Sequence, residues 1–221
     1  MASQPGTRDL ILDAVDRALA TTGFRKLSMD DIAAAAGVSR RTIYVYFASK
    51  EEVGLSSIDR VVAATYDRLE RIATTEPDPA EALRAILVER VLFRVDSVHD
   101  YRTSLDELFE AVRPAYMARR RQQHDREVAL VARVIAAGCA QGQFACDDAA
   151  ATAATLVAAT NAFLPYSLSV QELGERDRIA AGIRRMANLL IKSLTADAPA
   201  RAAARRPANR QAPARARRSR P

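Results

Sequence analysis

The chain has 221 residues, of which 49% are apolar and 27% charged, so it is long enough for one full-sized domain, or for a small and a medium one, with a buried core. Its apolar runs are shorter than the roughly 20 residues of a membrane-spanning helix. Charged residues interrupt residues 1–20, so this segment lacks the apolar core of a secretory signal. We therefore expect a cytoplasmic protein with no membrane partner. The net charge of +6 comes from a C-terminal run of arginines, so the rest of the chain is not strongly basic.

Residues 8–22 have the spacing of an amphipathic helix. Apolar side chains recur at steps of three and four from Leu10 to Leu19, and Gly23 supplies a residue that can adopt the left-handed conformation at a helix end. Abundant alanine favours helix in the rest of the body as well, and no strand alternation competes with it. We therefore predict an all-α protein whose first helix covers these residues.

A second helix start follows at Ser28. Ser28 and Asp31 have the spacing of a capping box, and Leu27 and Ile32 have the spacing of a hydrophobic staple across it. Gly37 then marks the end of a short helix. The pattern therefore predicts a short helix between Ser28 and Gly37.

Two further helix starts repeat this pattern. Ser39 follows Val38, and Ile43 lies where it can complete a second staple. Ser49 and Glu52 mark the third start, whose helix is expected to run to about residue 74. Two short helices joined by a tight glycine turn, the second of about eight residues, are typical of a helix-turn-helix unit.

The second helix of this unit is expected to have one apolar and one outward face. On a helical wheel, Ile43 and Phe47 form the buried stripe, and Arg41, Thr42 and Val45 point the opposite way. An outward face with arginine and threonine and without acids suits a polyanion. The geometric prediction on which the functional interpretation depends is that these three side chains face away from the core.

Major-groove binding to DNA explains the residue types around this face. Arginine can fork onto guanine, valine can touch a thymine methyl group, and the hydroxyl or ammonium groups of Thr42, Tyr44, Tyr46 and Lys50 can hold phosphates. Helix starts near Ser28 and Ser39 offer backbone N–H groups to phosphate as well. An alternative interpretation makes the tyrosines and Phe47 a corner of the core, and the Arg40–Arg41 pair an ordinary solvated face.

Residues 28–53, SMDDIAAAAGVSRRTIYVYFASKEEV, closely resemble the DNA-binding signature of the TetR family of bacterial transcriptional regulators, and the resemblance extends over about residues 8–56. It implies a homodimer with three DNA-binding helices and about six further helices for effector binding and dimerisation in each subunit. It also implies phosphate contacts by Thr42, Tyr44, Tyr46 and Lys50, and base reading by Arg40, Arg41 and Val45. Because the family often has a larger side chain at position 45, an operator sequence cannot be transferred.

Beyond the turn at residues 76–79 the periodic segments lengthen. We expect helices over residues 80–98, 101–112, 115–141, 147–169 and 175–195, which makes about nine in total. The predicted organisation is a helix-turn-helix DNA-binding domain at 1–52, a helical effector-binding and dimerisation bundle at 53–196, and a disordered basic tail at 197–221.

The last two long helices carry complementary stripes. Small residues on one helix and a leucine and isoleucine stripe on the other would pack closely, and two copies would form a four-helix dimer interface. Burial within one chain is the alternative. The candidate interface residues are Ala153, Val157, Ile179, Ile183, Met186 and Leu190.

A ligand pocket is expected between the middle helices, where most of the remaining aromatic residues fall. Pro165 interrupts its helix at a point where a kink could open space. Plain core is the alternative for each of these aromatic residues, and the sequence does not identify the effector. The candidate pocket residues are Tyr66, Phe93, Tyr101, Phe109, Tyr116, Phe163 and Tyr166, with His99, Arg113 and Asn161 as polar anchors.

The C-terminal tail carries eight arginines and no acid between residues 198 and 221, whereas the rest of the chain has 25 basic and 27 acidic side chains. Its alanines and prolines offer too little apolar surface to offset the entropy of ordering, so we expect disorder. The tail either adds non-specific phosphate contacts or is an inert extension.

The function predicted from these features is sequence-specific binding of a palindromic double-stranded operator by a homodimeric regulator, which a small-molecule effector releases. An enzyme is disfavoured because phosphate-binding loops, nucleophile elbows and zinc-protease motifs are absent. Neither a disulfide framework nor a zinc site can be assembled from Cys139, Cys146, His99 and His124, so we expect no metal and no cofactor. A non-specific DNA binder driven by the tail is the remaining rival, and repression is favoured over activation only by the resemblance.

Overall fold

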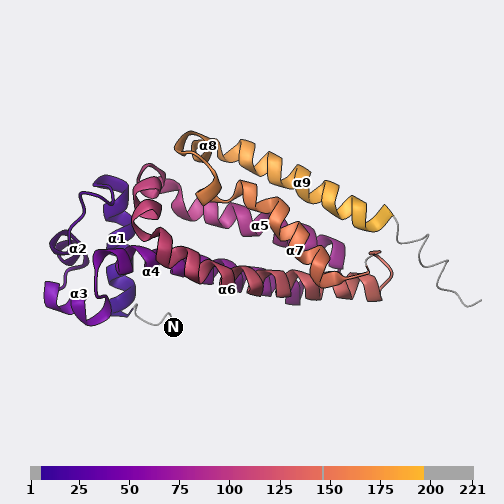
Figure 1. The fold of residues 1–221 in the computed structure, drawn as a ribbon, viewed down its shortest axis with the longest axis horizontal. Helices are drawn as coiled ribbons and strands as arrows, with labels where there is room; N and C mark the ends of the chain where they lie inside the picture. Colours follow the sequence, from indigo (N-terminus) through magenta and orange to yellow (C-terminus); the bar gives the residue numbers. More distant parts are fainter. Residues whose placement is uncertain (1–5, 146, 197–221) are drawn as a thin grey trace, which may run out of the picture.

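The computed structural model describes residues 6–145 and 147–196, and the expected disordered tail and Cys146 lie outside these ranges. A small N-terminal unit contains α1 (Thr7–Thr21), α2 (Met29–Ala36) and α3 (Arg40–Tyr46). The longer α4 (Lys50–Thr75) leaves this unit and runs along the body of the molecule (Figure 1). The small unit therefore lies at one end of an elongated helical bundle.

The body is built from α5 (Pro79–Val98), α6 (Leu105–Ala140), α7 (Ala149–Thr160), α8 (Val170–Gly174) and α9 (Arg176–Ala196). A 3-10 turn, η1 (His99–Ser104), joins α5 to α6, and two more, η2 (Asn161–Phe163) and η3 (Pro165–Ser167), follow α7. In contact with α5 lie α4, α6 and α9, and α7 packs on α6 (Figure 1). The described part of the chain contains no strand, so the all-α prediction is confirmed.

Two expected helix boundaries are wrong. Pro114 does not separate two helices but lies inside the continuous α6. Proline has no backbone N–H, so the carbonyl of Glu110 lacks its usual helical partner at Pro114. Both residues are exposed, so water can bond to that carbonyl. The helix expected over 147–169 ends instead at Thr160, because Leu164 precedes Pro165 and is held in the extended region, with φ −78° and ψ 148°.

The apolar core consists of two clusters. The first combines residues of the small unit, such as Leu12, Ile43 and Phe47, with Leu105 and Leu108 of α6. The second fills the far half of the bundle, between α4, α5, α6, α7 and α9. No break in packing therefore occurs near the expected domain boundary at residue 52.

A glycine makes the first cluster possible at the start of α4. A Cβ atom on Gly54 would lie 2.6 Å from Leu108 Cδ1 and 2.9 Å from the ring of Phe24. Because α4 has no side chain at this position, α6 and the loop after α1 can both approach its backbone. The small unit is thereby locked against the start of α6.

A layer of buried polar side chains separates the two clusters. Along the chain, four such residues lie between residues of the first cluster and residues of the second, one each on α4, α5 and α6 and one at the end of α7: Thr65, Arg90, Glu127 and Thr160. We call these four residues the polar layer. Burying a charge is costly unless it is paired, so the hydrogen bonds of this layer decide whether the bundle is stable.

Two further observations bear on the sequence predictions. Cys139 is disulfide-bonded. The sequence predicts no disulfide framework, and a single bridge is not such a framework. No helix in the described ranges is both long enough and apolar enough to cross a bilayer.

Candidate functional site

The entry into α2 is built from local hydrogen bonds, as expected. The Ser28 backbone N–H donates to Asp31 Oδ2 at 2.9 Å, and the Asp31 N–H donates to Ser28 Oγ at 3.2 Å. The Ser28 hydrogen bonds hold the pKa of Asp31 below its ordinary value. At the other end Gly37 has φ 68°, and its N–H bonds to the carbonyls of the last turn. These caps fix both ends of a helix that is too short to be stable alone.

Local hydrogen bonds also fix the start of α3. Ser39 Oγ accepts the Thr42 N–H at 3.0 Å, and the two side-chain hydroxyls are 2.8 Å apart. Ile43 and Phe47 are fully buried, which holds the helix against the small unit. The two serines at the helix starts, Ser28 and Ser39, therefore use their hydroxyls as caps.

The outward face of α3 is available to a partner molecule. Val45 is 75% exposed, Arg41 is exposed and Thr42 is half-buried. Arg41 and Val45 therefore face away from the core as predicted, whereas Thr42 is half-buried and its hydroxyl lies 2.8 Å from that of Ser39. Tyr44 and Tyr46 are 47% and 42% exposed on its flanks, so the interpretation of these two tyrosines as a corner of the core is wrong, whereas it holds for Phe47.

The two remaining candidate cations, Arg40 and Lys50, are held by the protein itself. Arg40 Nη1 donates to Asp30 Oδ2 at 2.8 Å, and its guanidinium lies over the Tyr44 ring. Lys50 Nζ donates to the carbonyl of Phe24 at 3.1 Å and lies over that residue's ring. Arg41 has no such partner among the described residues, which leaves its guanidinium as the freest cation of the face.

A second feature is a cleft in the middle of the bundle, partly open to solvent. Of the predicted pocket residues, Tyr101, Phe109, Tyr116, Asn161 and Tyr166 line it. Pro165 lines it too, although by ending the helix rather than kinking it. The expectation of a pocket between the middle helices is thus matched by a cleft at that place.

Five predicted pocket residues lie outside this cleft. His99 and Arg113 are exposed, and Phe163 packs on α9, where a Cβ on Gly182 would lie 2.8 Å from its ring. Phe93 lies beneath the guanidinium of Arg68, and Tyr66 lies beneath that of Arg126 and faces a separate hollow. Tyr66, Phe93 and Phe163 therefore pack against arginines or α9 and do not line the cleft.

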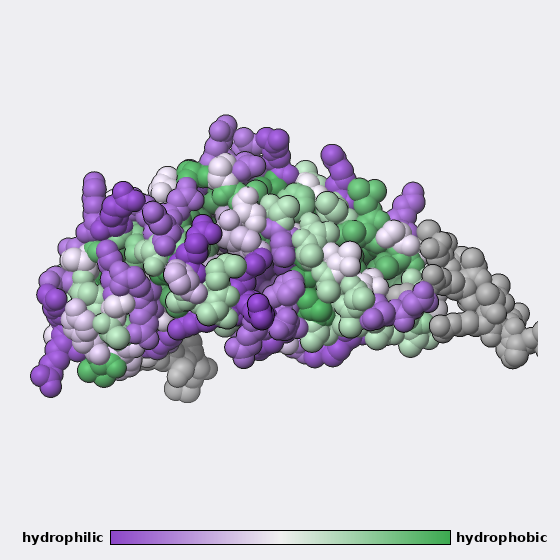
Figure 2. All heavy atoms as spheres, in the orientation of Figure 1, coloured by the Kyte–Doolittle hydropathy of each residue, from purple (hydrophilic) through white to green (hydrophobic). Residues whose placement is uncertain are grey.

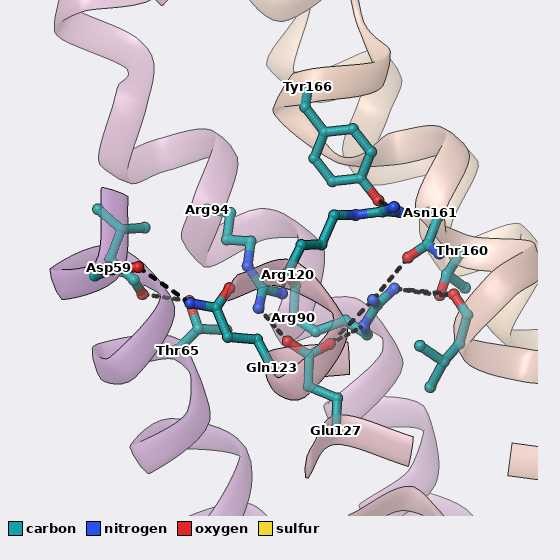
Figure 3. A network of polar contacts seen from close by, with 12 residues as sticks. Asp59, Thr65, Arg90, Arg94, Arg120, Gln123, Glu127, Thr160, Asn161 and Tyr166 are labelled. Carbon is teal, nitrogen blue, oxygen red and sulfur yellow. Dashed lines mark hydrogen bonds and ion pairs between the residues drawn. The ribbon is translucent and has the colours of Figure 1, made fainter. Parts of the chain in front are cut away.

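Sequence reasoning missed the charged residues of the cleft. Arg90 Nε donates to Glu127 Oε2 at 3.0 Å, and the Arg94 guanidinium donates to Glu127 Oε1 (Figure 3). Arg90 also donates to Thr160 Oγ1 at 2.5 Å and to Asn161 Oδ1 at 3.0 Å. Burial alone would raise the pKa of Glu127, but Arg94 and Arg90 outweigh it and hold that pKa below its ordinary value. The carboxylate therefore stays ionised between two guanidiniums.

One further arginine reaches the cleft from α6. Arg120 Nη2 donates to the Tyr166 hydroxyl at 2.7 Å, and its guanidinium lies 4.7 Å from the centre of that ring (Figure 3). Tyr116 packs beside Tyr166, with 6.2 Å between ring centres. Burial raises the pKa of Tyr116 to about 12, so its hydroxyl is a hydrogen-bond donor at neutral pH.

The small unit is tied to the walls of the cleft by two sets of contacts. Arg60 of α4 donates to Asp13 and Asp16 of α1, both at 2.6 Å. At the start of α6, the Ser104 hydroxyl donates to the Leu19 carbonyl at 2.7 Å, and Glu107 accepts the Arg25 N–H at 2.9 Å. Both α4 and the η1–α6 corner also line the cleft, so they connect it to α1.

The predicted dimer interface is wrong for four of its six residues. Ala153 and Val157 are buried in the second core cluster, and Ile179 and Ile183 in the first. Their side chains already pack within one chain, which was the alternative interpretation. Met186 and Leu190 are half-buried. The helical periodicity correctly indicated a buried stripe, but other helices of the same chain bury it, not a second subunit.

The opposite faces of the same two helices are exposed. Ala151, Thr155 and Ala158 form a row of small side chains on α7, and Leu189 of α9 is 61% exposed. Figure 2 shows apolar side chains gathered over the α7 and α9 half of the molecule, whereas hydrophilic side chains dominate the end that contains the small unit. This combined surface of α7 and α9 is called the small-residue face below.

Comparison with known proteins gives two family matches. A model described as "Bacterial regulatory proteins, tetR family" matches residues 11–54, and one described as "Tetracyclin repressor-like, C-terminal domain" matches residues 79–180. The HTH-type transcriptional regulator EthR of Mycolicibacterium smegmatis is 41% identical over 75 residues, which are 34% of this chain and 35% of that protein. The sequence match thus spans about a third of this relative.

Solved structures extend the likeness to most of the fold. A transcriptional regulator from Cytophaga hutchinsonii has a TM-score of 0.70 at 20% identity, over 86% of this chain and 100% of that one. A regulator of the TetR/AcrR family from Thermobifida fusca has a TM-score of 0.58 at 25% identity, over 80% and 96%. With matches to both the N-terminal and the C-terminal family models on a shared all-helical fold, the chain belongs to the TetR family of bacterial regulatory proteins.

Proposed function

We propose that this protein is a sequence-specific DNA-binding regulator that reads the major groove with α3. The observation that carries the proposal is the outward face of α3, where Arg41 and Val45 are exposed and no acid is present. Arg41 is assigned to a guanine edge, Val45 to a thymine methyl group, and Tyr44 and Tyr46 to flanking phosphates. Lys50 donates to the carbonyls of Phe24 and Arg25, and its third N–H is assigned to a phosphate of the DNA.

Selection of bound fragments from random double-stranded DNA by the full chain tests this proposal. We expect enrichment of a palindromic motif whose half-sites are related by the two-fold axis of a dimer. Binding without enrichment would overturn the proposal and favour the rival function, a non-specific DNA binder that depends on the arginines of residues 198–221.

The second half-site requires a second subunit, and we assign the dimer contact to the small-residue face. Small side chains on α7 let two helices approach closely, and Leu189 supplies exposed apolar surface beside them. The interface therefore uses α7 and α9, as the sequence suggested, but by their outer rather than their inner faces.

Replacing Leu189 by arginine is expected to convert the dimer to a monomer at micromolar concentration. Burying an unpaired charge in the contact costs at least about 3 kcal/mol, or roughly a hundredfold in association. Sedimentation or light scattering gives the molar mass. Met117→Arg, at another exposed apolar position on α6, is the control and leaves the mass unchanged. A dimeric Leu189→Arg protein would place the contact elsewhere.

We further propose that a small molecule in the central cleft lowers DNA affinity. A ligand there touches α4 through Ile58 and Val62 and the η1–α6 corner through Tyr101 and Leu105. Both elements are hydrogen-bonded to the small unit. If the ligand binds more tightly to a subunit arrangement in which the distance between the two α3 helices no longer matches the two half-sites, it lowers the affinity for the operator. We expect crystal structures with ligand and with DNA to differ in the position of α4; an unmoved α4 would contradict this.

A further inference from the structure

The central cleft contains more positive than negative charge. Arg90, Arg94 and Arg120 line it, and Glu127 is the single carboxylate among the lining residues of the described chain. Counted as formal charges, these four side chains leave two positive charges in excess. Charges in a partly dehydrated cleft interact more strongly than they would at the surface.

The three arginines differ in how their charge is compensated. Arg90 and Arg94 share the carboxylate of Glu127 and are also bonded to Thr160 Oγ1 and to the Arg90 carbonyl. Arg120 has no carboxylate within ion-pair distance among the described residues, and its hydrogen bond is to the Tyr166 hydroxyl. The guanidinium of Arg120 is therefore the place where an incoming anion gains most.

Besides these charged side chains and the polar Gln123, His124 and Asn161, the cleft is lined by aliphatic and aromatic residues. Ile58, Val61 and Val62 of α4 face Val98, Leu105 and Phe109 across it. Tyr116 adds a hydroxyl that stays protonated at neutral pH because burial raises its pKa to about 12. The Tyr116 ring lies 6.2 Å from the ring of Tyr166, whose hydroxyl accepts a hydrogen bond from Arg120, so this pair of tyrosines and the Arg120 guanidinium form one polar corner of the cleft.

We infer that the ligand of this cleft is an amphipathic anion, with an apolar body against the α4 wall and a carboxylate, sulfonate or phosphate head group on Arg120 and Tyr116. A cation would meet two excess positive charges, and a neutral apolar molecule would dehydrate Arg120 without replacing its hydrogen bonds with water. This inference rests on the proposed function, since it names the effector class of the same cleft.

Two fluorescent probes with the same apolar ring system, one with and one without an anionic group, measure how much the anionic group contributes to affinity. 8-Anilino-1-naphthalenesulfonate carries an anionic group, and N-phenyl-1-naphthylamine is the same ring system without it. We expect the full chain to bind the sulfonate at least about tenfold more tightly, the effect of one or two charge-assisted hydrogen bonds. Equal affinity for the two probes would overturn the inference.

Variants at Arg120 locate the effect. Arg120→Gln is expected to weaken sulfonate binding about tenfold and to leave the neutral probe unchanged, whereas Arg120→Lys retains most of the affinity. Arg113→Gln is the matched control, because Arg113 is exposed on the same helix outside the cleft. An equal loss in Arg113→Gln, or no loss in Arg120→Gln, would mean that the probe binds elsewhere, for example to surface arginines, and would overturn the inference.

Competition then distinguishes the head groups. Decanoate, decyl phosphate and decan-1-ol have the same chain, and we expect one or both anions, but not the alcohol, to displace the sulfonate probe. Displacement by the alcohol alone would overturn the inference. Fragment selection on the same preparation separates the two proposals. An enriched motif with equal probe affinities overturns the anion inference and leaves the proposed regulation. A missing motif with tighter sulfonate binding overturns the proposed regulation and leaves an anion site that has no effector role.

Discussion

Replacing Arg41 by alanine is expected to weaken binding to the selected operator by at least about thirtyfold. A bidentate arginine–guanine contact is worth about 1–3 kcal/mol, and a dimer loses it twice. The side chain is exposed on α3, so the free energy of unfolding should change by less than about 0.5 kcal/mol. Fluorescence anisotropy with operator and with scrambled DNA measures the effect, and we expect preference at one base pair of each half-site to relax.

Arg71→Ala provides the control for this experiment. Arg71 is an exposed arginine near the end of α4 that lies away from the small unit, so its removal changes the net charge equally. We expect this control to reduce affinity slightly and equally for operator and scrambled DNA. Equal losses in both variants would show that Arg41 contributes charge only and does not read a base.

Replacing Glu127 by glutamine is expected to destabilise the protein by about 3–5 kcal/mol, since it leaves two buried guanidiniums without their carboxylate. Arg90 and Arg94 both bond to Glu127 in the polar layer. For a chain of this length the loss corresponds to a fall in Tm of roughly 6–20 °C in calorimetry. Glu110→Gln, at an exposed position of the same helix, should lower Tm by no more than a few degrees.

The same carboxylate predicts a pH dependence. The pKa of Glu127 in the folded protein lies below the ordinary glutamate value of 4.5, so the unfolded state binds its proton first as pH falls. Its contribution is therefore complete above about pH 5 and is lost as pH falls through the folded pKa. The difference in Tm between the wild type and Glu127→Gln should shrink on acidification; a constant difference would contradict this.

The sequence predicts the small unit better than the cleft, for a physical reason. The caps at Ser28 and Ser39 and the left-handed turn at Gly37 are local interactions, so their spacing in the sequence is enough to recognise them. The buried stripe of Ile43 and Phe47 follows from helical periodicity in the same way. What these outward side chains bind stays a prediction that only the DNA experiments test.

The cleft depends on contacts between residues that are far apart in the chain. Arg90 and Arg94 reach Glu127 across more than 30 positions, and charged residues in a sequence are ordinarily interpreted as exposed. One signal could have identified them: on α5 the arginines continue the buried stripe of Leu83 and Leu87 at helical spacing. A charged side chain on an apolar stripe indicates a buried partner, but the sequence does not say which one.

The shared packing of the small unit and the body limits how new DNA specificities can arise. Ile43 and Phe47 lie in one apolar cluster with Leu105 and Leu108, and Gly54 admits Leu108 to the backbone of α4. In a chimera that joined the DNA-binding unit of a relative to this body at residue 52, the two parts would have to match across this shared cluster. Otherwise the junction would contain voids and clashes. New operator specificities can arise with less loss of stability by substitution of the few solvent-facing side chains of α3, because these side chains make no contact in the shared cluster.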